Sequence, residues 1–175
     1  MKEEEFYEEL LGFSNLRINS LEKTSRKIIF YCELRGQKAS CPNCLKETKK
    51  VNQTESRKVQ DLKISEREVW LDIKVRQFFC PKCNRYFFDN PEWIEKGKSY
   101  TKRQRKWIFE LCKKQCFTQV GALVNLSYKT VKRLFYNEAE KQINLKKRYA
   151  QVRKLGIDEI AHHKGKKIML VYWLI

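Results

Sequence analysis

The sequence predicts an α+β protein with three regions: a small antiparallel β domain over 1–98, a helical segment over 99–150 and a final β-hairpin over 151–175. Three observations lead to this prediction. Apolar residues alternate with a period of two in the first region, two C-P-x-C pairs lie between its strands, and apolar residues recur at helical spacing between 101 and 140. With 42% hydrophobic residues, the 175-residue chain has enough apolar material for packed cores.

The first region reads as a short helix followed by strands. Phe6, Leu10 and Leu11 share one helical face, and Gly12 can end that helix. Two later segments each have one apolar strand face, formed by Ile28, Phe30, Cys32 and Leu34 in one and by Val69, Leu71, Ile73 and Val75 in the other. We expect these strands to form a small antiparallel sheet.

The two C-P-x-C pairs predict a metal site. Cys41 and Cys44 form one pair, and Cys80 and Cys83 form the other. A two-residue spacing lets both thiolates of a pair reach one ion, and two such pairs complete a closed tetrahedral zinc site with a structural role. Four merely buried cysteines would not explain a turn-forming proline in each pair, and a redox C-x-x-C needs a thioredoxin-like context that is absent.

The remaining three cysteines are expected to pack in the core. Cys32 lies on the inward face of a predicted strand, and Cys112 and Cys116 are four apart on a predicted apolar helical face.

The charge is large and unevenly distributed. The chain has 38 Lys and Arg against 21 Asp and Glu, a formal net charge of +17, and residues 101–150 hold 13 basic against 3 acidic side chains. This excess favours a polyanion as partner, because Lys and Arg displace the counterions that condense on phosphates. The shift in composition near residues 97–100 also marks the predicted domain boundary.

Three helices are predicted in the basic region. Thr101 can cap a helix over 102–115 whose apolar stripe consists of Trp107, Ile108, Leu111 and Cys112. A shorter helix over 119–124 turns Val120, Leu123 and Val124 inward. Ser127 can cap a third helix over 128–140 whose apolar face is Val131, Leu134 and Phe135.

The last two of these helices have the layout of a helix-turn-helix. Gly121 allows a close helix crossing, Asn125 suits a left-handed turn position, and Val131 packs the third helix onto the second. A generic three-helix bundle with a solvated face is the alternative. The side chains predicted to contact DNA are Lys102, Arg103, Arg105, Lys106, Lys129, Thr130, Lys132, Arg133, Tyr136 and Asn137.

The last 25 residues predict a hairpin. A strand over 154–160 carries Asp158 and Glu159, and a second strand over 168–175 is apolar on both faces, as in the interior of a larger sheet. We therefore expect the chain to stop where an α/β domain begins.

The order of these features resembles the transposases of the ISL-three insertion-sequence family. The resemblance rests on the C-P-x-C pair at Cys41, the segment 59–64, the strand 69–76, the knuckle 79–83 with the aromatic residues 86–88 behind it, and the segment Leu155-Gly-Ile-Asp-Glu159. It implies an N-terminal zinc-ribbon-like domain, a helix-turn-helix bundle and the first hairpin of an incomplete RNase H-like DDE domain. By this resemblance Cys41, Cys44, Cys80 and Cys83 bind zinc, and Asp158 matches the first catalytic aspartate.

The same resemblance implies Mg²⁺ chemistry only where a complete set of three carboxylates is supplied. Glu159 cannot replace a missing carboxylate, because adjacent strand residues point to opposite faces. We therefore expect a C-terminally truncated chain that does not cleave or transfer DNA strands alone.

The expected function is to recognise the ends of an insertion sequence as the DNA-binding portion of a transposase. A stand-alone zinc-containing helix-turn-helix regulator, able to repress transposition, is the alternative, and an RNA- or protein-binding zinc module is a third reading. The expected partner is double-stranded DNA carrying terminal inverted repeats, with homo-oligomerisation on DNA left open. The acidic start and the absence of a long apolar run predict no membrane partner and a location in the bacterial cytoplasm at the nucleoid.

Overall fold

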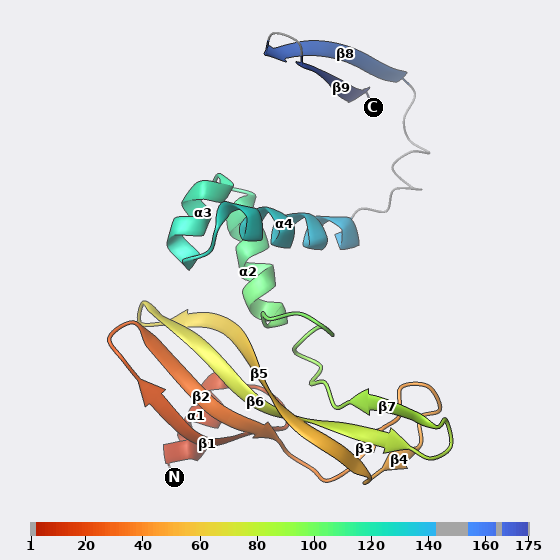
Figure 1. Ribbon diagram of the computed structural model, residues 1–175. Helices are drawn as coiled ribbons and strands as arrows, with labels where there is room; N and C mark the ends of the chain where they lie inside the picture. The colour runs from red at the N-terminus through yellow and green to blue at the C-terminus, as the bar shows by residue number, and fades with distance from the viewer. Residues whose placement is uncertain (1–2, 143–153, 164–165, 175) are drawn as a thin grey trace. The chain divides into compact units, whose positions relative to one another are not determined.

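The computed structural model describes residues 3–142, 154–163 and 166–174 (Figure 1). The chain divides into two compact units, Met1–Lys114 and Gln115–Ile175. The first unit contains helices α1 (Glu3–Leu11) and α2 (Lys102–Cys112) and strands β1 (Leu16–Lys23), β2 (Lys27–Leu34), β3 (Ala39–Ser40), β4 (Glu47–Thr48), β5 (Val51–Ile64), β6 (Arg67–Cys80) and β7 (Arg85–Phe88). The second contains helices α3 (Phe117–Val124) and α4 (Tyr128–Gln142) and strands β8 (Lys154–His163) and β9 (Lys166–Leu174).

The main sheet of the first unit is mixed and not antiparallel as predicted. Its strand order is β1-β2-β6-β5, and β7 pairs with one end of β6. Strands β1 and β2 are antiparallel, as are β5 and β6, but β2 and β6 run parallel with Ile28 opposite Val69 and Cys32 opposite Ile73. The prediction failed because alternation identifies the buried face of a strand and not the neighbour with which the strand pairs.

The long β5–β6 hairpin is the centre of this unit (Figure 1). Its strands are joined by Ser65 and Glu66, which both have positive φ angles, 47° and 64°. Two consecutive left-handed residues give a type I′ turn, whose twist matches that of the strands it joins. Strand β5 begins at Val51, well before the segment 59–64 that the sequence singled out.

The hydrophobic core lies on one face of the sheet. The strand faces predicted from residues 28–34 and 69–75 are confirmed, because all eight inward residues are buried. Helix α1 adds Leu11, which is buried, and Tyr7, which packs against the core. The other two apolar residues of this helix, Phe6 and Leu10, are 47% and 53% exposed.

Helix α2 packs against β5. It ends at Cys112, earlier than the predicted residue 115. Its buried residues are Gln104, Arg105, Ile108 and Phe109, so only Ile108 of the predicted apolar stripe is fully buried. Trp107, Leu111 and Cys112 are partly buried, and the predicted stripe missed the buried Gln104, Arg105 and Phe109.

In the second unit, the helices and strands lie close to their predicted positions. Val120 and Val124 of α3 are buried, as are Val131 and Leu134 of α4, whereas Leu123 is 47% exposed and does not face inward. Strands β8 and β9 form the predicted antiparallel hairpin, with Asp158 opposite Leu170. The tip of that hairpin, 164–165, lies outside the described residues. In the described part of the chain, no helix is long and apolar enough to cross a membrane.

Candidate metal centre and nucleic-acid interface

The two cysteine pairs occupy equivalent turns on neighbouring hairpins. Cys41 and Cys44 lie in the loop between β3 and β4, whereas Cys80 ends β6 and Cys83 lies in the turn from β6 to β7. In both turns the residue after the second cysteine is left-handed, with φ of 59° at Leu45 and 50° at Asn84. This conformation folds each turn back on itself, and the Leu45 N–H donates to the carbonyl oxygen of Cys41 at 2.9 Å.

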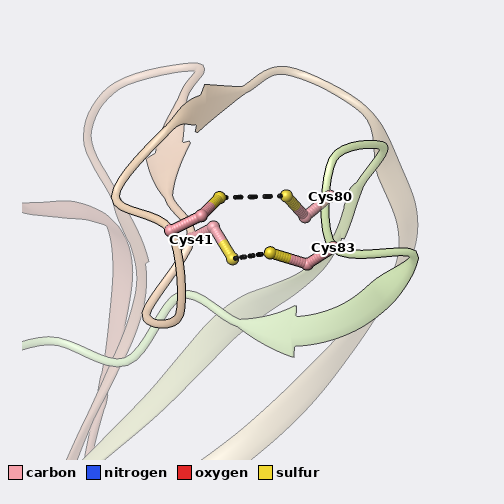
Figure 2. A group of neighbouring side chains, drawn as sticks. Cys41, Cys80 and Cys83 are labelled. Atoms are coloured by element: carbon pink, nitrogen blue, oxygen red, sulfur yellow. Dashed lines mark hydrogen bonds between the residues drawn. The ribbon is translucent and has the colours of Figure 1, made fainter.

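The four sulfur atoms converge on one point. All lie within 4.8 Å of one another. The Sγ atoms of Cys41 and Cys83 are 3.9 Å apart, and those of Cys44 and Cys80 are 3.6 Å apart; Figure 2 shows the sulfur atoms facing each other across the two loops. Four sulfurs at about 2.3 Å from one tetrahedral ion would be roughly 3.8 Å apart, so the donors fit a zinc ion.

Backbone N–H groups prepare this site for thiolates. Hydrogen bonds from the backbone of Asn43, and secondarily of Cys44, lower the pKa of the Cys41 thiol to about 7. The Asn43 side chain donates from Nδ2 to the Cys83 sulfur at 3.3 Å. Four thiolates close the coordination shell and leave no position for a reacting water, so the site supports structural Zn²⁺.

The other three cysteines do not join this cluster. Cys32 is buried as predicted, and burial together with the nearby Asp72 raises its pKa to about 12. Burial also raises the pKa of Cys112. Cys116 corrects a prediction, because it is exposed and occupies the N-cap of α3 instead of sharing a helical face with Cys112.

The N-terminus of α2 is fixed to β5. Thr101 is the N-cap, as predicted, and its hydroxyl oxygen accepts from the Gln104 N–H at 3.1 Å. The same hydroxyl donates to Oδ1 of Asp61 at 2.6 Å, and Arg103 Nε donates to that oxygen at 2.8 Å. Sequence reasoning missed this role of Asp61, because the polar Gln60 and Lys63 near it in β5 gave no local signal of a buried carboxylate.

Two arginines proposed for DNA contact serve the fold of this unit. Arg105 is 1% exposed and its guanidinium pairs with Glu95, which removes it from the DNA-contacting set. Arg103 pairs with Asp61 and donates from Nη1 to the carbonyl oxygen of Leu11 at 2.7 Å. Lys102 and Lys106, in contrast, are exposed.

Helices α3 and α4 are joined by a tight turn in which Gly121 and Asn125 have the predicted roles. Asn125 is left-handed, with φ 56° and ψ 47°, and its N–H donates to the Gly121 carbonyl oxygen. A Cβ atom at Gly121 would lie 2.6 Å from the carbonyl oxygen of Leu126, so only glycine fits. Ser127 caps α4, because its Oγ accepts from the Thr130 N–H at 3.3 Å.

An aromatic cluster adds to this junction. Phe117 of α3 lies 5.3 Å from the ring of Phe135 and 5.9 Å from that of Tyr128. These contacts fix the start of α3 against α4. Sequence reasoning placed the start of α3 at Gln119 and so left Phe117 out.

The predicted contact residues of α4 form a polar face opposite its buried residues. Val131 and Leu134 are buried, while Lys129, Lys132, Arg133 and Tyr136 are exposed and Thr130 and Asn137 are partly exposed. Lys132 Nζ lies 6.0 Å from the centre of the Tyr128 ring. The face therefore offers cations, an amide, hydroxyls and an aromatic ring on one regular element.

Two regions of the chain, which contain most of these elements, match known protein families. Residues 37–83 match the zinc-finger of transposase IS204/IS1001/IS1096/IS1165, and residues 89–139 match the helix-turn-helix domain of transposase family ISL3. The first region includes all four clustered cysteines, and the second runs from the end of β7 into α4.

One relative is the transposase for insertion sequence element IS1001 of Bordetella parapertussis. It is 24% identical to this chain over 161 residues, which are 91% of this chain and 39% of that protein. The chain therefore spans about two fifths of the length of this relative. No solved structure matches the chain. The zinc-ribbon and helix-turn-helix regions together take in more than half of the residues, and the chain belongs to the ISL3 family of transposases.

Proposed function

We propose that this chain recognises the terminal inverted repeats of an insertion sequence and that α4 is its recognition helix. The observation that carries the proposal is the polar face of α4, which presents Lys129, Lys132 and Arg133 on a helix held by a tight turn. A recognition helix must present such side chains rigidly to the major groove of duplex DNA. Binding to duplex DNA would place the protein at the bacterial nucleoid.

The side chains of α4 suit both kinds of DNA contact. Arg133 and Lys132 can donate to guanine or to phosphate, and Asn137 can pair with adenine. Thr130 and Tyr136 carry hydroxyls that can reach phosphate oxygens. Base readout requires a fixed helix, and the Ser127 cap and the Phe117 ring contacts fix α4 against α3.

Only two of the four cations of α2 that were predicted to contact DNA remain in the proposal. Lys102 and Lys106 are exposed and can neutralise phosphates, whereas Arg103 and Arg105 are engaged by Asp61 and Glu95. We therefore assign Lys102 and Lys106 to contacts with the DNA backbone, which position the protein without reading sequence.

A binding titration tests this proposal. Affinity for the element's terminal inverted repeat is compared with that for random duplex at several salt concentrations, because non-specific binding is mainly electrostatic. Tighter binding to the repeat is expected, with Arg133→Ala reducing the preference and Lys113→Gln serving as a control. Lys113 is the C-cap residue of α2, and its side chain already pairs with Glu110 at 2.8 Å. Equal affinity for both duplexes at every salt concentration would refute end recognition.

We also propose Asp158 as the first carboxylate of a DDE site, with Mg²⁺ bound only where the remaining carboxylates are supplied. Its support is the family membership together with its position within β8. Carboxylates that hold catalytic metal ions serve the strand-cleavage step and not the initial binding of DNA. Asp158→Ala is therefore expected to leave binding to the element's ends unchanged. A loss of end binding in this variant would place Asp158 in DNA recognition instead.

A further inference from the structure

A second group of exposed cations surrounds the cysteine cluster. We name residues 37–50 and 80–88 the zinc lobe; Figure 1 shows its strands β3, β4 and β7 gathered at one end of the β5–β6 pair. All six of its cations are exposed, and five of them are Lys46, Lys49, Lys50, Lys82 and Arg85. None of these five forms an ion pair within the described residues. A sixth, Lys38, pairs at 3.1 Å with Glu47, which is the lobe's one acidic residue.

The metal centre accounts for only part of this charge. Six cations against one carboxylate give the lobe a formal charge of +5. A Zn²⁺ ion with four thiolates carries a charge of −2, so two cations would be enough to balance it. The surplus of three positive charges remains at the surface, where it attracts anions.

The surplus cations are attached to rigid backbone. The Lys46 carbonyl oxygen accepts from the Cys41 N–H at 2.9 Å, and the Lys50 carbonyl oxygen accepts from the Phe79 N–H at 2.8 Å. Arg85 is paired with Cys80 across the β6–β7 ladder. Each of these residues is therefore tied to one of the two hairpins that hold the cysteines, which lowers the entropic cost of placing its charge beside a ligand.

The spacing within the first unit suits duplex DNA. From Val51, beside the zinc lobe, to Asp61, which holds the first turn of α2, β5 spans about 33 Å at roughly 3.3 Å per residue. One turn of B-DNA is about 34–36 Å long. The start of α2 and the zinc lobe are thus separated along β5 by about the length of one turn of duplex DNA.

We propose that the zinc lobe is a second DNA-contacting surface, which binds phosphates about one helical turn from those bound by Lys102 and Lys106. The lobe adds affinity and lengthens the protected stretch of DNA without reading bases, because mobile Lys and Arg side chains neutralise phosphates of any sequence. The inference rests on the proposed function only for the identity of the partner, and it assigns the metal centre the task of holding a phosphate-binding surface in shape.

The test compares three double variants of the full chain. The zinc lobe variant is Lys49→Gln with Lys82→Gln. The control is Lys23→Gln with Arg26→Gln, two cations of the β1–β2 hairpin that are also exposed. The helix variant is Lys132→Ala with Arg133→Ala. Affinity for the terminal repeat and for random duplex is measured against salt concentration, with hydroxyl-radical footprinting and zinc content determined on each variant.

The zinc lobe variant is expected to lower the slope of log affinity against log salt by about 1.8, since each lost phosphate contact contributes about 0.9. The loss should be equal for both duplexes, the footprint should shorten by about one turn, and zinc content should not change. The control should match the unmodified chain. A slope and footprint that do not change in the zinc lobe variant, or an equal fall in the control, would overturn the inference.

The helix variant separates failure of this inference from failure of the proposed function. Loss of preference for the repeat in that variant, with no effect in the zinc lobe variant, would leave end recognition standing and remove the second surface. Loss of zinc from the zinc lobe variant would show that Lys49 and Lys82 serve the metal centre instead, and would also overturn the inference.

Discussion

Arg103 of α2 and Asp61 of β5 form a bidentate ion pair that joins the helix to the sheet. Arg103 Nε lies 2.8 and 3.1 Å from the two carboxylate oxygens. The guanidinium also lies 4.0 Å from the centre of the Phe13 ring. The pair is asymmetric in exposure, because the side chain of Asp61 is 1% exposed and that of Arg103 is 37% exposed.

This asymmetry predicts unequal effects of removing either partner. Arg103→Met leaves a buried carboxylate without its cation and should lower the free energy of unfolding by about 3–5 kcal/mol. Asp61→Asn keeps the shape and leaves an arginine that water can reach, so a loss of about 1–2 kcal/mol is expected. Urea unfolding measures both, with the exposed Lys102→Met as control. Equal losses, or a larger loss for Asp61→Asn, would contradict the asymmetry.

Leu45 offers a gain in stability. Its φ of 59° is left-handed, a conformation that costs a residue with a Cβ atom roughly 1–2 kcal/mol. The side chain is 78% exposed, so little packing is lost on its removal. Leu45→Gly is therefore expected to stabilise the zinc-bound protein by about 1 kcal/mol. Thermal unfolding measures the change, and Leu45→Ala, which keeps the Cβ atom, should give no gain. A gain of similar size in both variants would assign the effect to lost exposed apolar surface.

Much of the fold followed from local patterns. The two buried strand faces, the Thr101 and Ser127 caps and the left-handed Asn125 depend on neighbouring residues and were predicted correctly. The four clustered cysteines were predicted because the chemistry of zinc constrains ligand type and spacing.

The remaining features depend on residues far apart in the sequence. The parallel pairing of β2 with β6 and the partners of Asp61 and Arg105 arise from contacts that no local period encodes. Sequence reasoning assigns arginine to solvent or to DNA by default, whereas Arg105 is buried because Glu95 neutralises it. The polar first half of β5 was missed because its residues are exposed on both faces and show no alternation.

The metal centre predicts a dependence on pH. The pKa of Cys41 is lowered to about 7 in the folded chain, below the value of about 8.5 for an unfolded cysteine. A lowered pKa means that the thiolate's contribution to stability is complete above pH 8.5 and is lost as the pH falls through 7. Zinc is therefore expected to be retained at pH 8. Because the bound ion competes with protons for the four thiolates, we expect its release, with unfolding of the zinc lobe, only as the pH falls well below 7.

A chelating dye and circular dichroism, recorded together across this pH range, measure release and unfolding. Cys80→Ser removes a ligand and should release zinc at higher pH, whereas Cys116→Ser changes an exposed cysteine outside the cluster and should not shift the profile. A profile that Cys116→Ser shifts as much as Cys80→Ser does would place the metal elsewhere.

Gly121→Ala tests whether the turn between α3 and α4 sets the position of α4, the proposed recognition helix. In an isolated helix the change would be favourable by about 1 kcal/mol, because alanine is the better helix former. Here the new Cβ atom would lie 2.6 Å from the Leu126 carbonyl oxygen, a backbone atom that cannot rotate away. The turn must open, so we expect a loss of about 1–3 kcal/mol in unfolding free energy and weaker binding to the inverted repeat.

Thr118→Ala, at an exposed position of α3, is the matched control and should have little effect on either measurement. Because the clash acts on the turn and not on the side chains proposed to contact DNA, a stable Gly121→Ala protein with unchanged repeat preference would show that the turn does not fix how α4 meets DNA.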